Sequence, residues 1–437
     1  MKKFLALLLS LVMVLALVAC GDKKDDTNTD DQDNNEVTDF KVGFIMLHDE
    51  NSTYDLNFIN AAKEACETLG VEYTIVTNVP EGQECYDKAA ELADAGCNII
   101  FADSFGHEDY MIQAAKDFPD VQFCHSTGTK AHTEGLSNYH NAFASIYEGR
   151  YLAGIAAGMK LNEMIANGEF TADEAKIGYV GAFTYAEVIS GYTSFFLGAR
   201  SVCPTATMEV TFTGSWYDET AEKEGAEKLI QNGCVLISQH ADSMGAPTAC
   251  EKAGVPNVSY NGSTVSVGPN TYIISSRIDW APYYVYAIQA AMDGKTIDAD
   301  WTGTLATKSV VLSDLNTNVA ADGTQAAIDE AMKKLENGEL HVFDVSTFTV
   351  TGENVTADMK TDAEGHLTSY MADVDNDANM EHDTEVVHDG YFAESEKRSA
   401  PYFDIAIDGI VRLDVNFDHF LYESTTRRKI EDDTQKK

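Results

Sequence analysis

Aromatic and polar side chains gather where short apolar runs of this chain end. The rings are those of Tyr54, Phe105, Trp216 and Tyr260, and the polar residues beside them are Ser104, His240, Asp242 and Asn261. Two rings facing across a cleft can sandwich a flat heterocycle, while the polar groups read base edges or a sugar diol. The alternative is structural, because an aromatic ring at a strand end is often a lid on the core.

The chain carries none of the common sequence patterns of catalytic or metal sites. It has no G-x-S-x-G, no H-E-x-x-H and no G-x-x-x-x-G-K-[ST]. It also has no C-x-x-C pair and no Cys/His cluster with zinc spacing. The 71 Asp and Glu residues are so numerous that the sequence neither excludes nor selects a catalytic carboxylate pair. We therefore predict a binding protein rather than an enzyme, with no metal and no cofactor.

The elements that position these residues alternate between strand and helix. The predicted strands are 41–47, 72–77, 98–102, 121–126, 176–182, 207–213, 234–239, 257–260, 271–276 and 308–312, with helical periodicity between most of them. Each strand is a short apolar run, as expected for a parallel sheet covered by helices on both faces. Ligands of open α/β sheets bind beyond the carboxyl ends of the strands, which selects the loops that carry the rings.

The predicted strands and helices form two series, one up to residue 126 and one from residue 176 onward. Two α/β units in one chain predict two lobes with a cleft between them. We assign residues 40–139 and 270–297 to lobe 1, and residues 140–269 and 298–345 to lobe 2. Residues 346–437 form an acidic extension with scattered β-like pieces, for which the sequence predicts no particular fold.

The first residues have the order of a secretion signal. Lys2 and Lys3 precede an apolar run, and Leu17-Val-Ala-Cys20 resembles the bacterial lipobox, which implies lipidation of Cys20 after removal of residues 1–19. Residues 20–39 are nearly all polar, so we expect a disordered tether. The prediction is a lipid anchor at the outer face of the cell membrane. The alternative, a transmembrane anchor, needs a longer apolar stretch.

Charge limits the possible partners. The formal net charge of −41 repels nucleic acid and anionic lipid surfaces, so we predict no nucleic-acid partner. Assigning Cys20 to lipid leaves an odd number of the eight cysteines, which argues against a full disulfide framework and leaves open whether any pair forms. We expect a monomer.

Several strings, in order, resemble the basic membrane protein family, also called Med/PnrA-like, whose members are substrate-binding lipoproteins of ABC importers. They are Asp103-Ser-Phe-Gly106, Phe118-Pro-Asp-Val-Gln-Phe123, Tyr147-Glu-Gly-Arg-Tyr-Leu-Ala-Gly154, Lys176-Ile-Gly-Tyr-Val-Gly-Ala-Phe183, Ser215-Trp-Tyr-Asp218, Gln239-His-Ala-Asp-Ser243 and Trp280-Ala-Pro-Tyr-Tyr284. The resemblance runs from about Lys41 to Phe343. It implies a type I periplasmic-binding fold, with two Rossmann-like lobes joined by three crossovers, and an ABC permease as partner.

The resemblance also implies a ligand and its contacts. Relatives hold purine nucleosides or nucleobases between aromatic rings, with acidic residues on the ribose. Residues on matching motifs are Phe105, Trp216, Gln239, His240 and Asp242, and the first loop, with Tyr54, matches more loosely. Where similar sequences carry Asp-Ser-Asp after the strand ending at Tyr260, this chain has Asn261-Gly-Ser263. The loss of two carboxylates argues against ribose binding and makes a free purine base, or another small polar heterocycle, a plausible ligand. The competing hypotheses are a surface nucleoside-processing enzyme and a ligand sensor or adhesin of the same fold.

Overall fold

The computed structural model describes residues 40–374, 382 and 384–413. All of them belong to one compact unit, Thr38–Lys437. The expected signal peptide, the tether and Cys20 lie outside the described residues. Within the described part of the chain, no helix has both the length and the apolar character needed to cross a bilayer.

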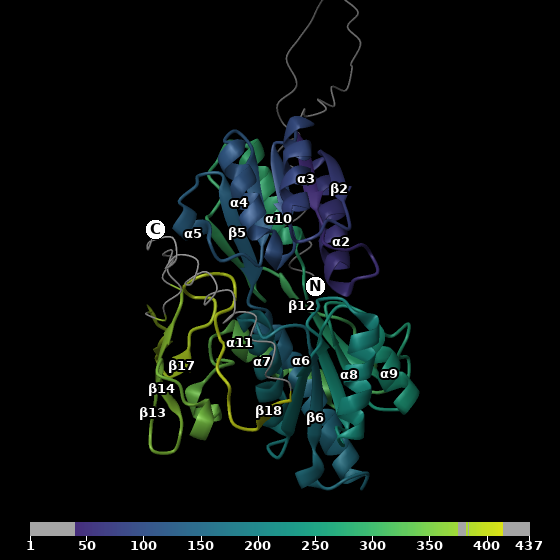
Figure 1. The fold of residues 1–437 in the computed structure, drawn as a ribbon. Helices are drawn as coiled ribbons and strands as arrows, with labels where there is room; N and C mark the ends of the chain where they lie inside the picture. Colours follow the sequence, from purple (N-terminus) through teal and green to yellow (C-terminus); the bar gives the residue numbers. More distant parts are fainter. Residues whose placement is uncertain (1–39, 375–381, 383, 414–437) are drawn as a thin grey trace, which may run out of the picture. The chain divides into compact units, whose positions relative to one another are not determined.

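The first sheet has six strands in the order β11-β5-β4-β3-β1-β2, all parallel. They are β1 (Lys41–Ile45), β2 (Glu72–Val76), β3 (Ile99–Ala102), β4 (Gln122–Ser126), β5 (Tyr139–Ala144) and β11 (Asp300–Gly303). The helices of this lobe are α2 (Thr53–Leu69), α3 (Gln83–Asp94), α4 (Glu108–Asp117), the short α5 (Ala131–Glu134) and α10 (Ala281–Met292), with the 3-10 turn η1 (Phe105–His107) before α4 (Figure 1).

Helices cover both faces of this sheet, as the apolar strands predict. Phe44 of β1 belongs to the core that includes Trp280 and Tyr284, beside α10 and α2. Ile45, the next residue, belongs instead to a separate core with side chains of α3 and α4. Successive side chains of a strand point to opposite faces, so burial of both neighbours requires a helix layer on each side.

The second sheet has the order β12-β10-β9-β8-β6-β7-β18, and only β12 runs antiparallel to its neighbour. Its strands are β6 (Lys176–Gly181), β7 (Thr207–Phe212), β8 (Leu236–His240), β9 (Asn257–Tyr260), β10 (Tyr272–Ile278), β12 (Val310–Leu312) and β18 (Ile410–Arg412). The helices are α6 (Ile146–Ala166), α7 (Ala186–Val202), α8 (Glu219–Gln231), α9 (Gly245–Ala253) and α11 (Thr324–Glu336), together with the 3-10 turn η2 (Ala172–Glu174).

The chain passes between the two sheets three times: after β5, after β10 and after β11. Two Rossmann-like lobes joined in this way form the type I periplasmic-binding fold, which confirms the predicted fold class.

The strand pairing differs from the expected lobe boundaries at three strands. β5 and β11 pair with each other in the first sheet, although 140–269 and 298–345 were expected in lobe 2. β10 pairs with β9 in the second sheet, although 270–297 was expected in lobe 1. An apolar run shows that a strand is buried, but its partner depends on contacts made far away in the sequence.

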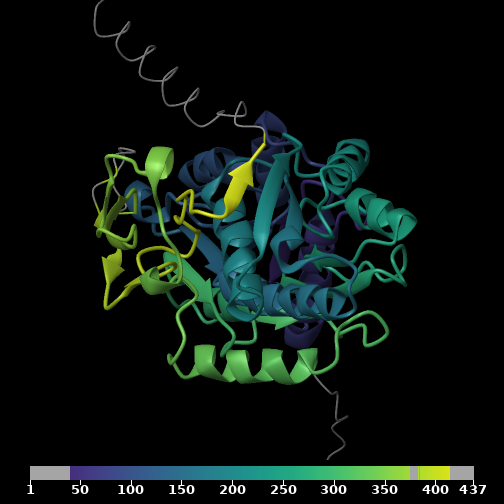
Figure 2. The ribbon, with the colours of Figure 1, turned by 90° about the horizontal axis from the view of Figure 1, so that it is seen from below.

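The C-terminal extension is folded onto the second lobe. It contains the 3-10 turns η3 (Val345–Thr347) and η4 (Gly352–Asn354) and the strands β13 (Met359–Thr361), β14 (Leu367–Ala372), β15 (Thr384–Glu385), β16 (Val387–His388) and β17 (Tyr391–Phe392). Phe403 stacks on Phe343 with ring centroids 4.2 Å apart. β18, the last strand in the described part of the extension, lies parallel to β7 at the edge of the second sheet (yellow in Figure 2). The extension therefore shares the core of the body.

The cysteines of the described chain act as small core residues. The seven that the structure describes are all buried free thiols.

Candidate functional site

A pocket lies at the carboxyl ends of strands from both sheets. It is lined by Leu47, His48, Tyr54, Asp55, Ser104, Phe105, Thr127, Glu187, Trp216, His240, Asp242, Tyr260 and Asn261. These residues leave about 360 Å³ of space between protein atoms, part of it open to solvent. The position is the one at which open α/β sheets bind ligands.

The start of α2 brings two side chains to the pocket. Ser52 caps this helix by accepting a hydrogen bond from the backbone N–H of Asp55, and its hydroxyl donates to Asp55 Oδ2 at 2.6 Å. The cap fixes the first helical turn, which holds Tyr54 and Asp55. A carboxylate in the first turn is also stabilised by the positive end of the helix dipole.

Rings from different loops meet at the pocket. Phe105 lies 5.1 Å from Tyr185, and Tyr185 lies 5.8 Å from Trp216, between ring centroids. Phe183 contacts Trp216 edge-on at 5.0 Å. The aromatic rings of both lobes therefore form a continuous cluster.

A buried cation supports the floor of the pocket. Arg150 on α6 donates hydrogen bonds to the Ser259 carbonyl at 3.1 Å and to the Tyr179 hydroxyl at 3.0 Å. Its guanidinium carbon lies 5.0 Å from the centroid of the Tyr260 ring, a cation–π arrangement. Tyr260 in turn lies 4.3 Å from the His240 ring. Arg150 therefore supports the Tyr260 ring, and through it the His240 ring, without lining the pocket itself.

Carboxylates give the pocket its charge. Asp242 is buried and accepts a hydrogen bond from Asn261 Nδ2 at 3.0 Å. Burial raises its pKa well above the ordinary value, and the negative charge of Asp55 adds to the effect. Glu187 lies 3.5 Å from Nε2 of His240, whose pKa is lowered by burial. A carboxylate that is buried near other negative charges needs hydrogen-bond donors to stay ionised.

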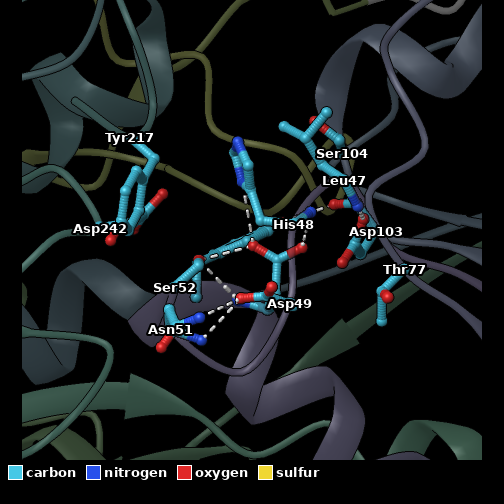
Figure 3. A network of polar contacts seen from close by, with 12 residues as sticks. Leu47, His48, Asp49, Asn51, Ser52, Thr77, Asp103, Ser104, Tyr217 and Asp242 are labelled. Carbon is cyan, nitrogen blue, oxygen red and sulfur yellow. Dashed lines mark hydrogen bonds and ion pairs between the residues drawn. The ribbon is translucent and has the colours of Figure 1, made fainter.

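A second carboxylate, that of Asp103, interacts with Asp55, and Figure 3 shows Asp103 beside Leu47. Oδ1 of Asp103 accepts from the Leu47 backbone N–H at 3.1 Å, and Oδ1 of Asp55 accepts from the His48 backbone N–H at 2.7 Å. Burial and the charge of Asp55 raise the pKa of Asp103. Burial acts to raise the pKa of Asp55 as well, but hydrogen bonds from His48 and Ser52 outweigh it and leave that pKa lowered. Asp55 is therefore the ionised member of the pair.

The structure brings together every predicted site residue except Gln239. Tyr54, Ser104, Phe105, Trp216, His240, Asp242, Tyr260 and Asn261 all line the pocket. Gln239 is buried within the second sheet, where its side-chain oxygen accepts from Asn257 Nδ2 at 3.0 Å. Its neighbour His240 faces the pocket, and adjacent residues of a strand point to opposite faces.

Five lining residues were missed by sequence reasoning: Leu47, His48, Asp55, Thr127 and Glu187. For Asp55 a signal was available, because Ser52-x-x-Asp55 has the spacing of a helix N-terminus that would place it at the strand-end edge. Thr127 follows β4 at the same edge, with a left-handed backbone at φ 74°. Glu187 ends a predicted strand-end loop, 183–187, but it is one of many acidic residues at helix starts and was not chosen as a ligand contact.

The fold and the pocket define a class of protein. Two α/β lobes with an aromatic and acidic pocket at their strand ends are the architecture of a solute-binding protein. The family described as ABC transporter substrate-binding protein PnrA-like matches residues 43–342, and the chain belongs to this family. Members are extracytoplasmic and work with a small-molecule ligand and an ABC permease.

Relatives and solved structures agree with this assignment. The chain is 34% identical to a purine-binding protein of Brucella abortus over 69% of this chain and 83% of the relative. It is 32% identical to a protein of Haloferax volcanii named as an ABC transporter glucose-binding protein, over 70% and 72% of the two chains. In fold it is similar to an ABC solute-binding protein of Aeropyrum pernix, with a TM-score of 0.58 at 17% identity, covering 72% and 94% of the two chains.

Proposed function

We propose that this protein is the substrate-binding lipoprotein of an ABC importer and captures a purine nucleobase or nucleoside between its lobes. The observation that carries the proposal is the group of rings in the pocket, Tyr54, Phe105 and Trp216, with carboxylates beside them. Stacking of a base on an aromatic ring contributes roughly 1–3 kcal/mol. The purine-binding name of the Brucella relative supports the same ligand class.

The proposed role of the protein is binding without chemistry. The ligand would select the closed arrangement of the lobes through contacts made only there. The closed form would then dock on the permease, while lipid on Cys20 keeps the protein at the outer face of the membrane. A change of Cys20→Ala should release the protein from the membrane fraction and abolish labelling by a palmitate analogue. Continued membrane association of this variant would overturn the lipid anchor.

A sugar is the second candidate ligand. Carboxylates that accept from hydroxyl groups and a tryptophan ring also suit a hexose, and the Haloferax relative carries a glucose-binding name. Sugars and purines differ in shape, because a purine offers two planar faces to the rings and a hexose offers only its C–H patches.

Isothermal titration calorimetry distinguishes these candidates. The protein should be unfolded and refolded first, to remove any ligand carried from the host. We expect a micromolar or lower Kd for at least one of adenine, guanine, hypoxanthine, adenosine, guanosine and inosine, and no binding of glucose. Binding of glucose alone would replace the purine assignment. Release of free base during incubation with nucleosides would contradict the binding role and favour an enzyme.

A further inference from the structure

We propose that the pocket selects purines that carry an exocyclic amino group and discriminates against their counterparts that lack it. The inference rests on the proposed function and specifies its ligand. It is carried by the direction of the hydrogen bonds in the pocket wall, which leaves the hydroxyl oxygens of Tyr54 and Ser104 as acceptors beside the carboxylates.

Three potential donors of the pocket wall are already engaged within the protein. The hydroxyl of Tyr54 donates to the backbone carbonyl of Asp103 at 2.7 Å. The hydroxyl of Ser104 donates to Oε1 of Glu81 at 2.5 Å. The amide of Asn261 donates to Oδ1 of Asp242 at 3.0 Å. Both hydroxyl groups can therefore offer a ligand only their oxygen lone pairs.

The carboxylates add further acceptors. Among the described residues, none donates a hydrogen bond to Oδ2 of Asp242, whose Oδ1 is held by Asn261. Among the described residues, the ion-pair contact of Glu187 is with the His240 ring, at 3.5 Å. None of the described residues that line the pocket is a lysine or an arginine. The guanidinium of Arg150 lies against the Tyr260 ring, and its Nη atoms donate to Ser259, Tyr179 and Ser238.

The donors that remain are few. Among the described side chains of the lining, they are the indole N–H of Trp216, the hydroxyl of Thr127, the second N–H of the Asn261 amide and the rings of His48 and His240. A purine amino group supplies two N–H donors to the hydroxyl oxygens and carboxylates of the pocket wall. An unpaired buried acceptor costs free energy, so the same pocket disfavours a ligand that lacks those donors.

The protonation of Asp242 gives a second readout. In the free protein, burial and the negative charge of Asp55 raise the pKa of Asp242, which favours its protonated form. An amino group that donates to the carboxylate favours the ionised form, and binding should then release a proton. If Asp242 instead remained protonated and donated to the ligand, a purine with an oxo group would be preferred and no proton would leave.

Two pairs of nucleosides test the selection, because each pair differs by a single amino group. They are guanosine against inosine and adenosine against purine riboside, with the corresponding free bases as a parallel set. We expect at least one amino member to bind fivefold or more tightly than its partner, with proton release seen as a buffer-dependent binding enthalpy. Affinity ratios below fivefold in every pair would overturn the inference while leaving the purine assignment intact. Failure of all these ligands to bind would overturn both.

The variant Asp242→Asn tests whether the side chain of Asp242 causes the preference for purines with an amino group. The substitution keeps the shape, removes the charge and replaces one acceptor by a donor. We expect the ratio of the Kd values of the two nucleosides in a pair to fall at least threefold and the proton release to disappear. Asp120→Asn, at an exposed position, is the matched control and should keep both. If Asp242→Asn is folded by circular dichroism and retains the ratio and the proton release, the assignment is wrong. If it does not fold, Asp242→Ser is tested by the same two measures.

Discussion

Trp216 is the residue on which the proposed stacking depends most directly. Its ring is half-buried, lies among rings of the second lobe at the pocket and packs against the edge of the main core. We expect Trp216→Ala to weaken binding of the best purine by roughly 5- to 150-fold, which corresponds to the loss of 1–3 kcal/mol of stacking. Calorimetric titration measures the change.

Two further variants serve as controls for that measurement. Trp216→Phe keeps a planar ring and should recover most of the affinity. Trp301→Phe changes a tryptophan that packs against Tyr283 at 5.1 Å, away from the pocket, and should leave the Kd unchanged. Equal affinities of Trp216→Ala and the unmodified protein would show that this ring does not hold the ligand.

Glu394 is a buried acid outside the pocket whose ionisation opposes folding. Burial raises its pKa to about 7 from an ordinary value of 4.5, although Ser190 and the backbone N–H of Tyr402 donate to it and Arg398 is nearby. The folded state therefore binds this proton more tightly than the unfolded state. The stability it contributes is present below pH 4.5 and is lost as the pH rises to about 7.

We expect Glu394→Gln to remove this pH dependence. Gln can donate to Ser190 and accept from Tyr402, as the protonated acid does. At pH 8 the variant should be more stable by up to about 3 kcal/mol, and at pH 4.5 the two proteins should be similar. Urea unfolding across this pH range measures the difference. A constant difference in the free energy of unfolding at all pH values would contradict the assignment.

At the scale of elements, α6 and α7 approach each other closely through glycines. A Cβ added at Gly154 of α6 would lie 2.0 Å from the backbone oxygen of Phe195, and one added at Gly198 of α7 would lie 2.0 Å from that of Tyr151. Backbone atoms cannot turn away as side chains do, so either substitution must separate the helices. We expect Gly154→Ala to lower the free energy of unfolding by about 1–3 kcal/mol or more, measured by urea titration.

Gly225 of α8 provides the control for helix propensity. Its nearest neighbour for an added Cβ is the Thr211 Cγ2 methyl at 3.3 Å, an atom that can shift. Ala is favoured over Gly in a helix, so Gly225→Ala should change stability by no more than about 1 kcal/mol, in either direction. Similar destabilisation by both variants would show that the α6–α7 contact is not the cause.

At the scale of the whole described unit, hydrogen bonds join the lobes beside the pocket. The backbone N–H of Thr53 donates to the Asp242 carbonyl at 3.0 Å, and Asn57 Nδ2 donates to the Asn261 carbonyl at 2.8 Å. Both donors belong to α2 of the first lobe and both acceptors to loops of the second. Asn57 does not line the pocket. These bonds favour the arrangement in which the lobes meet around a ligand.

We expect Asn57→Ala to weaken ligand binding although it removes no ligand contact. The loss of one hydrogen bond, about 0.5–1.5 kcal/mol, corresponds to a roughly 2- to 12-fold higher Kd. Small-angle scattering of the ligand-free variant should show a larger radius of gyration. Asn232→Ala, outside the pocket and on an exposed turn, should change neither quantity. An unchanged Kd in Asn57→Ala would show that this bond does not favour closure.

The sequence by itself determined the elements and the edge at which a ligand binds. Apolar runs and helical periodicity are local, so they predicted the strand–helix alternation and, through it, the loops at the strand ends. Except for Gln239, the residues chosen on those loops, from Tyr54 to Asn261, line one pocket in the structure. The family could also be identified from the sequence, because strings such as Lys176-Ile-Gly-Tyr-Val-Gly-Ala-Phe183 are contiguous in the chain.

Only the tertiary structure decided which face and which lobe a residue belongs to. Every residue of β8 is buried, so no alternation in the sequence shows that His240 faces the pocket and Gln239 does not. β5 and β11 pair across more than 150 residues. β18 joins β7 from an extension in which the sequence predicts β-like pieces, Phe403 to Leu413 among them, but not their partners. Such pairings depend on contacts between distant segments, whereas periodicity reports only on burial of neighbouring residues.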